Sequence, residues 1–191
     1  VKALRKNTLT LPAMNVKAVA DKKNIIKSKE SAFELQMDVT PGRLATTGVE
    51  LYNAKGEKVK IYFDTKERKL VMDRTESGLV EFGKRSVPHD IEKNYSDVHQ
   101  GVGNTPFRVL NSINYKNDFA LGTWAPLSLC KGTTYHVDIF VDKCSVEIFV
   151  DGGRIAMTNL VFPTAPYTSV KFYNNGASTS FRNITLSELS L

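Results

Sequence analysis

The chain contains few of the residues on which disulfide and metal chemistry depend. It has two cysteines and three histidines among 191 residues. Cys130 and Cys144 show no C-x-x-C spacing and are too few for a disulfide framework, and the sequence does not fix the distance between them. His89, His99 and His136 share no spacing that suits a metal. We expect no metal and no cofactor, although carboxylates on loops leave a calcium site open.

Long apolar runs are also missing. No stretch approaches the roughly 18 consecutive apolar residues that a membrane helix needs, so we expect no transmembrane span. The first residues, VKALRK, lack the apolar segment of a signal peptide. The composition, 41% apolar and 24% charged, is that of a globular domain and excludes a disordered chain. The length suits one domain with its own core.

The net charge of +6 is concentrated at the start of the chain. Residues 1–30 hold eight Lys or Arg and two acidic residues, which accounts for the whole excess. The remaining residues balance, and they contain no basic helix and no aromatic run typical of RNA-binding sheets. We therefore expect a solvated basic leader segment and no nucleic-acid partner.

Alternation of apolar and polar residues dominates, which predicts strands. The predicted strands near the two ends of the chain cover residues 31–39, 48–53, 57–64, 168–174 and 180–190. Residues 83–126 break any period, and connections of that length are usually functional or contain small elements that the pattern hides. About ten short strands and no helix predict an all-β fold. We expect two antiparallel sheets packed face to face as a concanavalin-like or lectin-like β-sandwich.

The clearest signal lies in residues 133–160, which predict a three-stranded meander. A turn at Lys143-Cys144 and a second at Gly152-Gly153 place one aliphatic row on the same face. The predicted pairs are Val141–Val146, Ile139–Ile148, Val137–Val150, Val150–Ile155 and Ile148–Met157. A one-residue slip would put all these side chains into water. Gly-Gly supplies the positive φ angles of a tight turn, across which Asp151 and Arg154 could pair.

Pairing residues across an assumed turn in the same way predicts a second hairpin. With Lys66-Glu67 as the turn, Phe63 faces Leu70 and Ile61 faces Met72. Lys-Glu is a poor sequence for a two-residue turn, so a longer loop remains open.

The other face of the meander carries carboxylates, the side chains on which a glycosidase site depends. Two carboxylates about 5–10 Å apart are needed for that chemistry. In the predicted register Glu147 faces Phe140 and Asp138 faces Phe149, so carboxylates alternate with rings and form no dyad. Phe140 and Phe149 are out of phase with the core, and two large rings on neighbouring strands indicate a covered surface. The cover could be the second sheet, another domain or a sugar, and we favour protein.

Four blocks, in order, resemble the C-terminal β-sandwich of glycoside hydrolase family 32, the family of invertases, levanases and inulinases. The longest runs from His136 to Arg154 (HVDIFVDKCSVEIFVDGGR) and continues with Thr158 and the VFP of 161–163. The others are LVMDRTESG at 70–78, APL at 125–127 and VKALR at 1–5. The connection from Gly78 to Ala125 is longer than is usual in that family.

This resemblance implies where the chemistry lies. Family members cleave fructosidic bonds in a five-bladed propeller that precedes the sandwich, using Trp-Met-Asn-Asp-Pro, Arg-Asp-Pro and Glu-Cys motifs, and none of these occurs here. We therefore expect no catalytic residue. We expect a junction segment at 1–15 leading from the propeller and a sandwich over 16–191. The expected role is that of a non-catalytic accessory domain of a fructan or sucrose hydrolase. An extracellular or periplasmic parent enzyme is favoured.

The resemblance also implies a subsidiary hypothesis. Family 66 carbohydrate-binding modules are similar sandwiches that bind fructose, so the alternative function is a stand-alone levan-binding or fructose-binding module. A fructose site needs a charged group for vicinal hydroxyls and a ring for the sugar face. The candidates are Asp73, Arg74, Glu147 and Trp124. A structural interpretation competes: Arg74 could be part of a buried ion pair, and Trp124 could fill the core.

Overall fold

Two antiparallel sheets account for almost every element in the computed structural model of this chain. The structure describes residues 2–17, 24–80, 119–128 and 132–190. These form one 3-10 turn, η1, and thirteen strands. The elements are η1 Lys2–Leu4, β1 Arg5–Leu11, β2 Met14–Val16, β3 Ile25–Lys27, β4 Phe33–Thr40, β5 Thr46–Tyr52, β6 Lys58–Asp64, β7 Lys69–Glu76, β8 Gly122–Pro126, β9 Tyr135–Val141, β10 Ser145–Val150, β11 Ile155–Leu160, β12 Ser169–Asn175 and β13 Thr179–Leu189.

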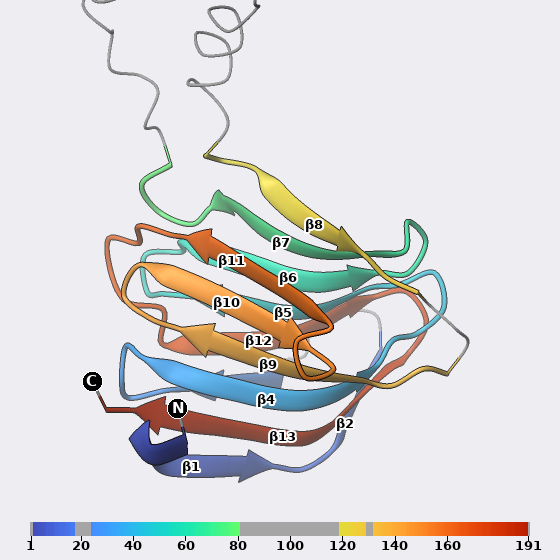
Figure 1. The fold of residues 1–191 in the computed structure, drawn as a ribbon, viewed down its shortest axis with the longest axis horizontal. Helices are drawn as coiled ribbons and strands as arrows, with labels where there is room; N and C mark the ends of the chain where they lie inside the picture. Colours follow the sequence, from blue (N-terminus) through green and yellow to red (C-terminus); the bar gives the residue numbers. More distant parts are fainter. Residues whose placement is uncertain (1, 18–23, 81–118, 129–131, 191) are drawn as a thin grey trace, which may run out of the picture.

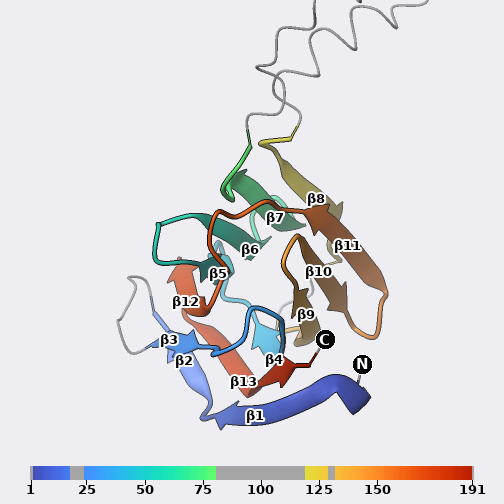
Figure 2. The ribbon, with the colours of Figure 1, turned by 90° about the vertical axis from the view of Figure 1, so that its left-hand side faces the viewer.

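The sheets pack face to face, as Figures 1 and 2 show. The seven-stranded sheet has the order β1-β13-β4-β9-β10-β11, with β2 also paired to β13. The six-stranded sheet has the order β3-β12-β5-β6-β7-β8. The predicted all-β sandwich is therefore confirmed.

The core lies between the sheets because alternate residues of each strand point inward. Strand β6 shows this directly: Val59, Ile61 and Phe63 are at most 2% exposed. Aromatic pairs join the two layers, with ring centroids 5.2 Å apart for Phe172 and Phe181. Burial of such rings contributes about 1.5–3 kcal/mol each. The two outer faces remain available to carry other side chains.

The predicted registers are confirmed in both hairpins. Strand β10 pairs Ile148 with Ile139 of β9 and with Met157 of β11. In the turn at 151–154, Gly152 and Gly153 have φ of 68° and 93°. The Arg154 guanidinium lies 2.7 Å from the Asp151 carboxylate, so the predicted pair forms. In the other hairpin Phe63 pairs with Leu70, but the loop is the longer one, over residues 65–68.

Other expectations need correction. The basic leader contains strands: β1 pairs with β13, and β3 pairs with β12. The irregular stretch 83–126 ends in β8, which the sequence analysis did not predict. The rest of that stretch, residues 83–118 with His89 and His99, lies outside the described residues, as does Cys130. Leu4 accepts a backbone hydrogen bond from Ser190, so the first and last described strands meet at one edge.

Candidate functional site

The outer face of the seven-stranded sheet carries two mixed rows of rings and carboxylates. The first row crosses β4, β9 and β10 through Glu34, Phe140 and Glu147. The second crosses the same strands through Gln36, Asp138 and Phe149. The register therefore sets each ring beside a carboxylate on the neighbouring strand. The rings of Phe140 and Phe149 meet edge to face, with centroids 5.8 Å apart, and both are half-buried.

An ion pair joins the first row to the start of the chain. The Arg5 Nε and Nη2 atoms of β1 donate to Glu34 Oε2 and Oε1 at 2.5 and 2.7 Å. Glu34 is 2% exposed, whereas the Arg5 side chain is 25% exposed. A bidentate pair of this kind is a strong and directional contact. It fixes β1 across β13 to Glu34, the residue opposite Phe140.

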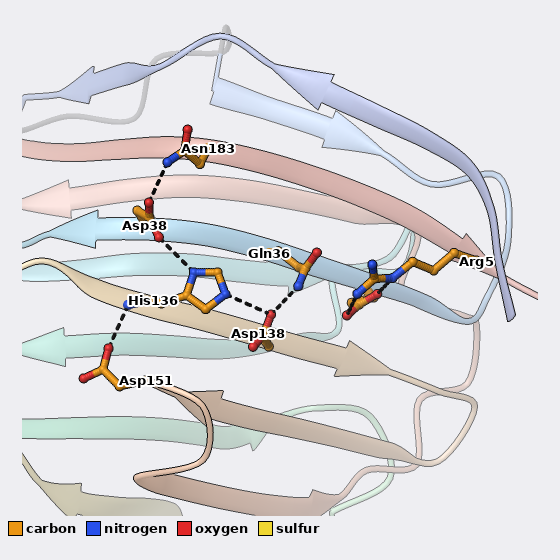
Figure 3. Close-up of polar contacts among 8 residues, drawn as sticks. Arg5, Gln36, Asp38, His136, Asp138, Asp151 and Asn183 are labelled. Carbon is orange, nitrogen blue, oxygen red and sulfur yellow. Dashed lines mark hydrogen bonds and ion pairs between the residues drawn. The ribbon is translucent and has the colours of Figure 1, made fainter. Parts of the chain in front are cut away.

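A polar cluster lies on the same face around His136, and Figure 3 shows its contacts. The His136 Nδ1 lies 2.9 Å from Asp38 Oδ1, and its Nε2 lies 3.5 Å from Asp138 Oδ1. Asp38 also accepts from Asn183 Nδ2, and Asp138 accepts from Gln36 Nε2, both at 2.6 Å. The cluster joins β13, β4 and β9. Its carboxylates are already engaged by partners within the sheet, which indicates a stabilising network.

Two pKa values shift because of these contacts. The hydrogen bond to Asp38 raises the pKa of His136 above its ordinary 6.5, against the opposing effect of burial. Burial alone would raise the pKa of Asp38, but the hydrogen bonds from His136 and Asn183 together lower it below 3.8. The pair is therefore charged on both sides in mildly acidic solution.

Replacing His136 with glutamine is expected to destabilise the domain near pH 5 more than near pH 8.5. A raised histidine pKa gives stability that is complete below the unfolded pKa near 6.5 and is lost as pH rises through the folded value. The imidazole is half exposed, so the difference stays below about 1 kcal/mol. Urea unfolding of both proteins across this range measures it. A gap between them that does not change with pH would contradict the prediction.

The structure does not bring the four candidate fructose residues together. Asp73 and Trp124 lie on the outer face of the six-stranded sheet, where Asp73 pairs with Gly122 and Val71 with Trp124. Glu147 lies on the outer face of the other sheet, beside Phe140. A single site containing all four side chains is therefore excluded by the fold.

Arg74 lies between the sheets at one end of the sandwich. Its Nη1 donates to the Leu160 carbonyl oxygen at 3.0 Å, and its guanidinium lies 4.1 Å from the ring centre of Phe119. It forms no ion pair with any described residue, so the expected buried ion pair is not seen there. Its buried Nε has no hydrogen-bond partner in the described part of the chain, and burial lowers its pKa. This arginine joins β7 to β11.

Trp124 is not a core residue. Its side chain is 56% exposed, and the Lys69 ammonium lies 4.5 Å from the ring centre. Two further rings on the same face, Tyr62 and Tyr173, are half-buried and were not predicted from the sequence. Both are out of phase with the buried residues of their strands. A ring out of phase with the core is the same signal that identified Phe140, and it could have identified Tyr62 and Tyr173.

The described residues show neither a metal centre nor a membrane-spanning helix. They contain no group of three or more His, Cys, Asp or Glu side chains that could hold a metal ion. Within the same ranges, no helix is long and apolar enough to cross a membrane.

These features define the chain as a β-sandwich module with two differently composed outer faces. A sequence model of a known family, described as "Glycosyl hydrolases family 32 C terminal", matches residues 1–188. The chain belongs to glycosyl hydrolase family 32, as the C-terminal domain of its levanase-type and invertase-type enzymes. The resemblance found in the sequence is confirmed at the level of this family.

Relatives and solved structures agree with that assignment. The chain is 30% identical over 95 residues to a levanbiose-producing levanase of Bacillus subtilis, matching 50% of this chain and 17% of the relative. It is 27% identical over 139 residues to a sucrose-6-phosphate hydrolase of Staphylococcus xylosus, matching 73% and 21%. The fold resembles the exo-inulinase of Aspergillus awamori at a TM-score of 0.65 and 16% identity, covering 99% of this chain and 31% of that one. The chain thus spans about a fifth of the curated relatives' length or less.

Proposed function

We propose that this chain is a non-catalytic accessory domain of a β-fructosidase that acts on fructans or sucrose. Its role is to pack against the catalytic propeller that precedes it and to stabilise that propeller. The relatives' names, levanase and sucrose-6-phosphate hydrolase, support this substrate class. None of the three catalytic motifs named above occurs in the sequence.

One observation carries the proposal. Phe140 and Phe149 form a half-buried ring pair on an outer sheet face, where no inner-core role explains them. The Arg5–Glu34 ion pair joins β1 to β4 on the same face, and Glu34 is the residue opposite Phe140. A domain that precedes β1 would begin at the edge of this same sheet, with β13 and β4 between β1 and the strand of Phe140. We call Phe140, Phe149 and Glu147 the docking face, and we propose that it contacts the propeller.

The test begins with the gene. The sequence upstream of Val1 is expected to encode the three catalytic motifs, and an upstream sequence without them would overturn the proposal. The purified 191-residue chain is expected to release no fructose from sucrose or levan, in an assay that detects one turnover per hour. Hydrolysis by this chain alone would contradict the non-catalytic role.

Replacing both Phe140 and Phe149 with alanine is expected to lower the unfolding temperature of the propeller in the joined protein. Full burial of each ring at an interface contributes about 1.5–3 kcal/mol, and the isolated chain already has a part of this because both rings are half-buried. In the isolated chain the same pair of changes should cost less than in the joined protein, because there the rings lose only their partial burial and their contact with each other. Calorimetry of the joined protein and of the isolated chain separates the two effects.

Trp124→Ala, on the opposite outer face, is the matched control. It removes a ring of comparable size that the proposal leaves outside the interface. Equal effects of the Phe140/Phe149 and Trp124 changes on the propeller would refute the docking face.

A further inference from the structure

A row of rings crosses the outer face of the six-stranded sheet. Register places Tyr173 of β12 opposite Gly48 of β5, Gly48 opposite Tyr62 of β6, Tyr62 opposite Val71 of β7, and Val71 opposite Trp124 of β8. We call Tyr173, Tyr62, Val71 and Trp124 the aromatic row. Since Gly48 has no side chain, the two tyrosine rings meet above it, with centroids 6.5 Å apart.

The row combines exposed apolar surface with unused hydrogen-bonding groups. Trp124 is 56% exposed and the tyrosines are half-buried. No described residue forms a hydrogen bond with either tyrosine hydroxyl. Burial raises the pKa of Tyr62 and of Tyr173, so both hydroxyls keep their protons and can donate. Asp73, one row away, uses Oδ1 to accept from Thr75, and no described residue donates to its Oδ2.

The charges beside the row cancel. From β12 to β8 the outer face carries four lysines and four carboxylates, namely Lys58, Lys60, Lys69, Lys171, Glu50, Asp64, Asp73 and Glu76. Several are paired already: Lys171 lies 3.3 Å from Glu50, and Lys58 lies 3.0 Å from Glu76. A face without net charge attracts neither polyanions nor polycations. It fits a neutral ligand that offers apolar surface and hydroxyl groups together.

The dimensions favour an extended ligand. The row crosses five adjacent strands, β12-β5-β6-β7-β8, which at the usual strand spacing is about 19 Å. A single sugar ring would cover only a part of it. A chain of sugars offers an apolar ring face to each aromatic side chain and hydroxyls to Asp73, Lys60 and the two tyrosines.

We propose that the aromatic row binds a neutral oligosaccharide, which lies across the strands with its sugar rings on Trp124 and Tyr62. This site includes Asp73 and Trp124 of the predicted fructose site and excludes Arg74 and Glu147. It lies on the opposite side of the sandwich from the docking face, so both can be occupied in one protein. The choice of fructans as first probes rests on the function proposed above.

Trp124 is the only tryptophan of the chain, so its fluorescence reports on this site. Titration of the 191-residue chain with levan-type, inulin-type and malto-oligosaccharides is expected to give a saturable change with at least one of them, at millimolar ligand or below. Calorimetry should then show at least tenfold weaker binding for Trp124→Ala and for Tyr62→Ala, about 1.4 kcal/mol each. Tyr62→Phe should weaken binding less than Tyr62→Ala.

The matched control is the Phe140→Ala/Phe149→Ala variant, which should bind as tightly as the parent. Unfolding by urea checks that the three binding variants are folded. Trp124→Ala is the variant least expected to disturb folding, because Trp124 is exposed. No fluorescence change and no heat with any of the three ligands would overturn the proposal. Unchanged binding by the Trp124→Ala variant would also overturn it. So would self-association of the chain, if Trp124→Ala abolished that self-association. None of these results bears on the docking face, whose test uses the other sheet.

Discussion

Arg5→Ala is expected to lower the free energy of unfolding by about 3 kcal/mol. The Glu34 carboxylate is 2% exposed and accepts two hydrogen bonds from the Arg5 guanidinium. Without Arg5, a buried negative charge loses its counter-ion, and breaking such a pair costs about 3–5 kcal/mol. The 25% exposure of Arg5 admits some water, which places the effect at the lower end of that range. Urea unfolding of the isolated chain measures it.

Two further variants separate charge from geometry. Arg5→Lys keeps the positive charge but loses the two-pronged donor, so it should recover only part of the stability. The double change of Arg5 to methionine and Glu34 to leucine removes the buried charge altogether and should recover most of it. If Arg5→Ala costs less than about 1 kcal/mol, Glu34 is less dependent on Arg5 than its burial implies.

Arg5→Ala is also expected to affect the attachment of strand β1. Among the described strands, β1 lies at the edge of its sheet and pairs with β13 alone, and Arg5 anchors it to β4 across that neighbour. Amide exchange in β1 should therefore quicken in Arg5→Ala more than in β4 or β9. If a propeller precedes the chain as proposed, a loosened β1 would also weaken the connection to it.

Sequence alone could predict the parts of the fold that are local. The β9-β10-β11 meander and the β6-β7 hairpin join strands by short turns, so alternation and turn residues together fix which residues face each other. Ile139 opposite Ile148 and Phe63 opposite Leu70 follow from this arithmetic. The outer position of Phe140 and Phe149 follows as well, because it is the other phase of the same alternation.

Pairings between distant segments could not be predicted in this way. Strand β4 pairs with β9 and β13, and the contact of His136 with Asp38 joins residues 98 positions apart. No local pattern distinguishes that partner from other carboxylates. The strands β2 and β3 have three residues each, too few to show a period, and most of β1 is exposed on both phases. The charge of this leader suggested a solvated segment, whereas its backbone groups pair with β12 and β13.

Prediction of the candidate site was limited in the same way, because it depends on how distant strands are placed. Alternation along β7 places Arg74 on the same side as Leu70 and Met72, but its contact with Leu160 depends on how the sheets pack. Glu147 and Asp73 lie on outer faces in their own strands, and sequence cannot say that those faces belong to opposite sheets. The aromatic row appears only when β12, β5, β6, β7 and β8 are placed in order.

Gly48→Ala is expected to cost about 3 kcal/mol or more, or to prevent folding. A Cβ atom at this position would lie 2.0 Å from the Ile61 carbonyl oxygen and 2.7 Å from the Tyr62 Cα. Both contacts are with backbone, so no side chain can turn away to relieve them. The β5-β6 pairing would have to shift, and β5 is a central strand that also holds β12.

Gly122→Ala provides the control, since Gly122 lies on the same outer face. Its added Cβ would lie 3.6 Å from Val71 Cγ1 and 3.9 and 4.0 Å from Asp73 Cα and Cβ, which are ordinary van der Waals contacts. That change should stay within about 0.5 kcal/mol of the parent in thermal unfolding. Equal stability of the two glycine variants would show that β5 and β6 do not approach as closely as the register requires. Because Tyr62 and Tyr173 meet above Gly48, a displaced β5-β6 pair would also separate the two rings. Where the Gly48→Ala protein still folds, its oligosaccharide binding should therefore fall together with its stability, whereas Gly122→Ala should leave the tyrosine pair intact.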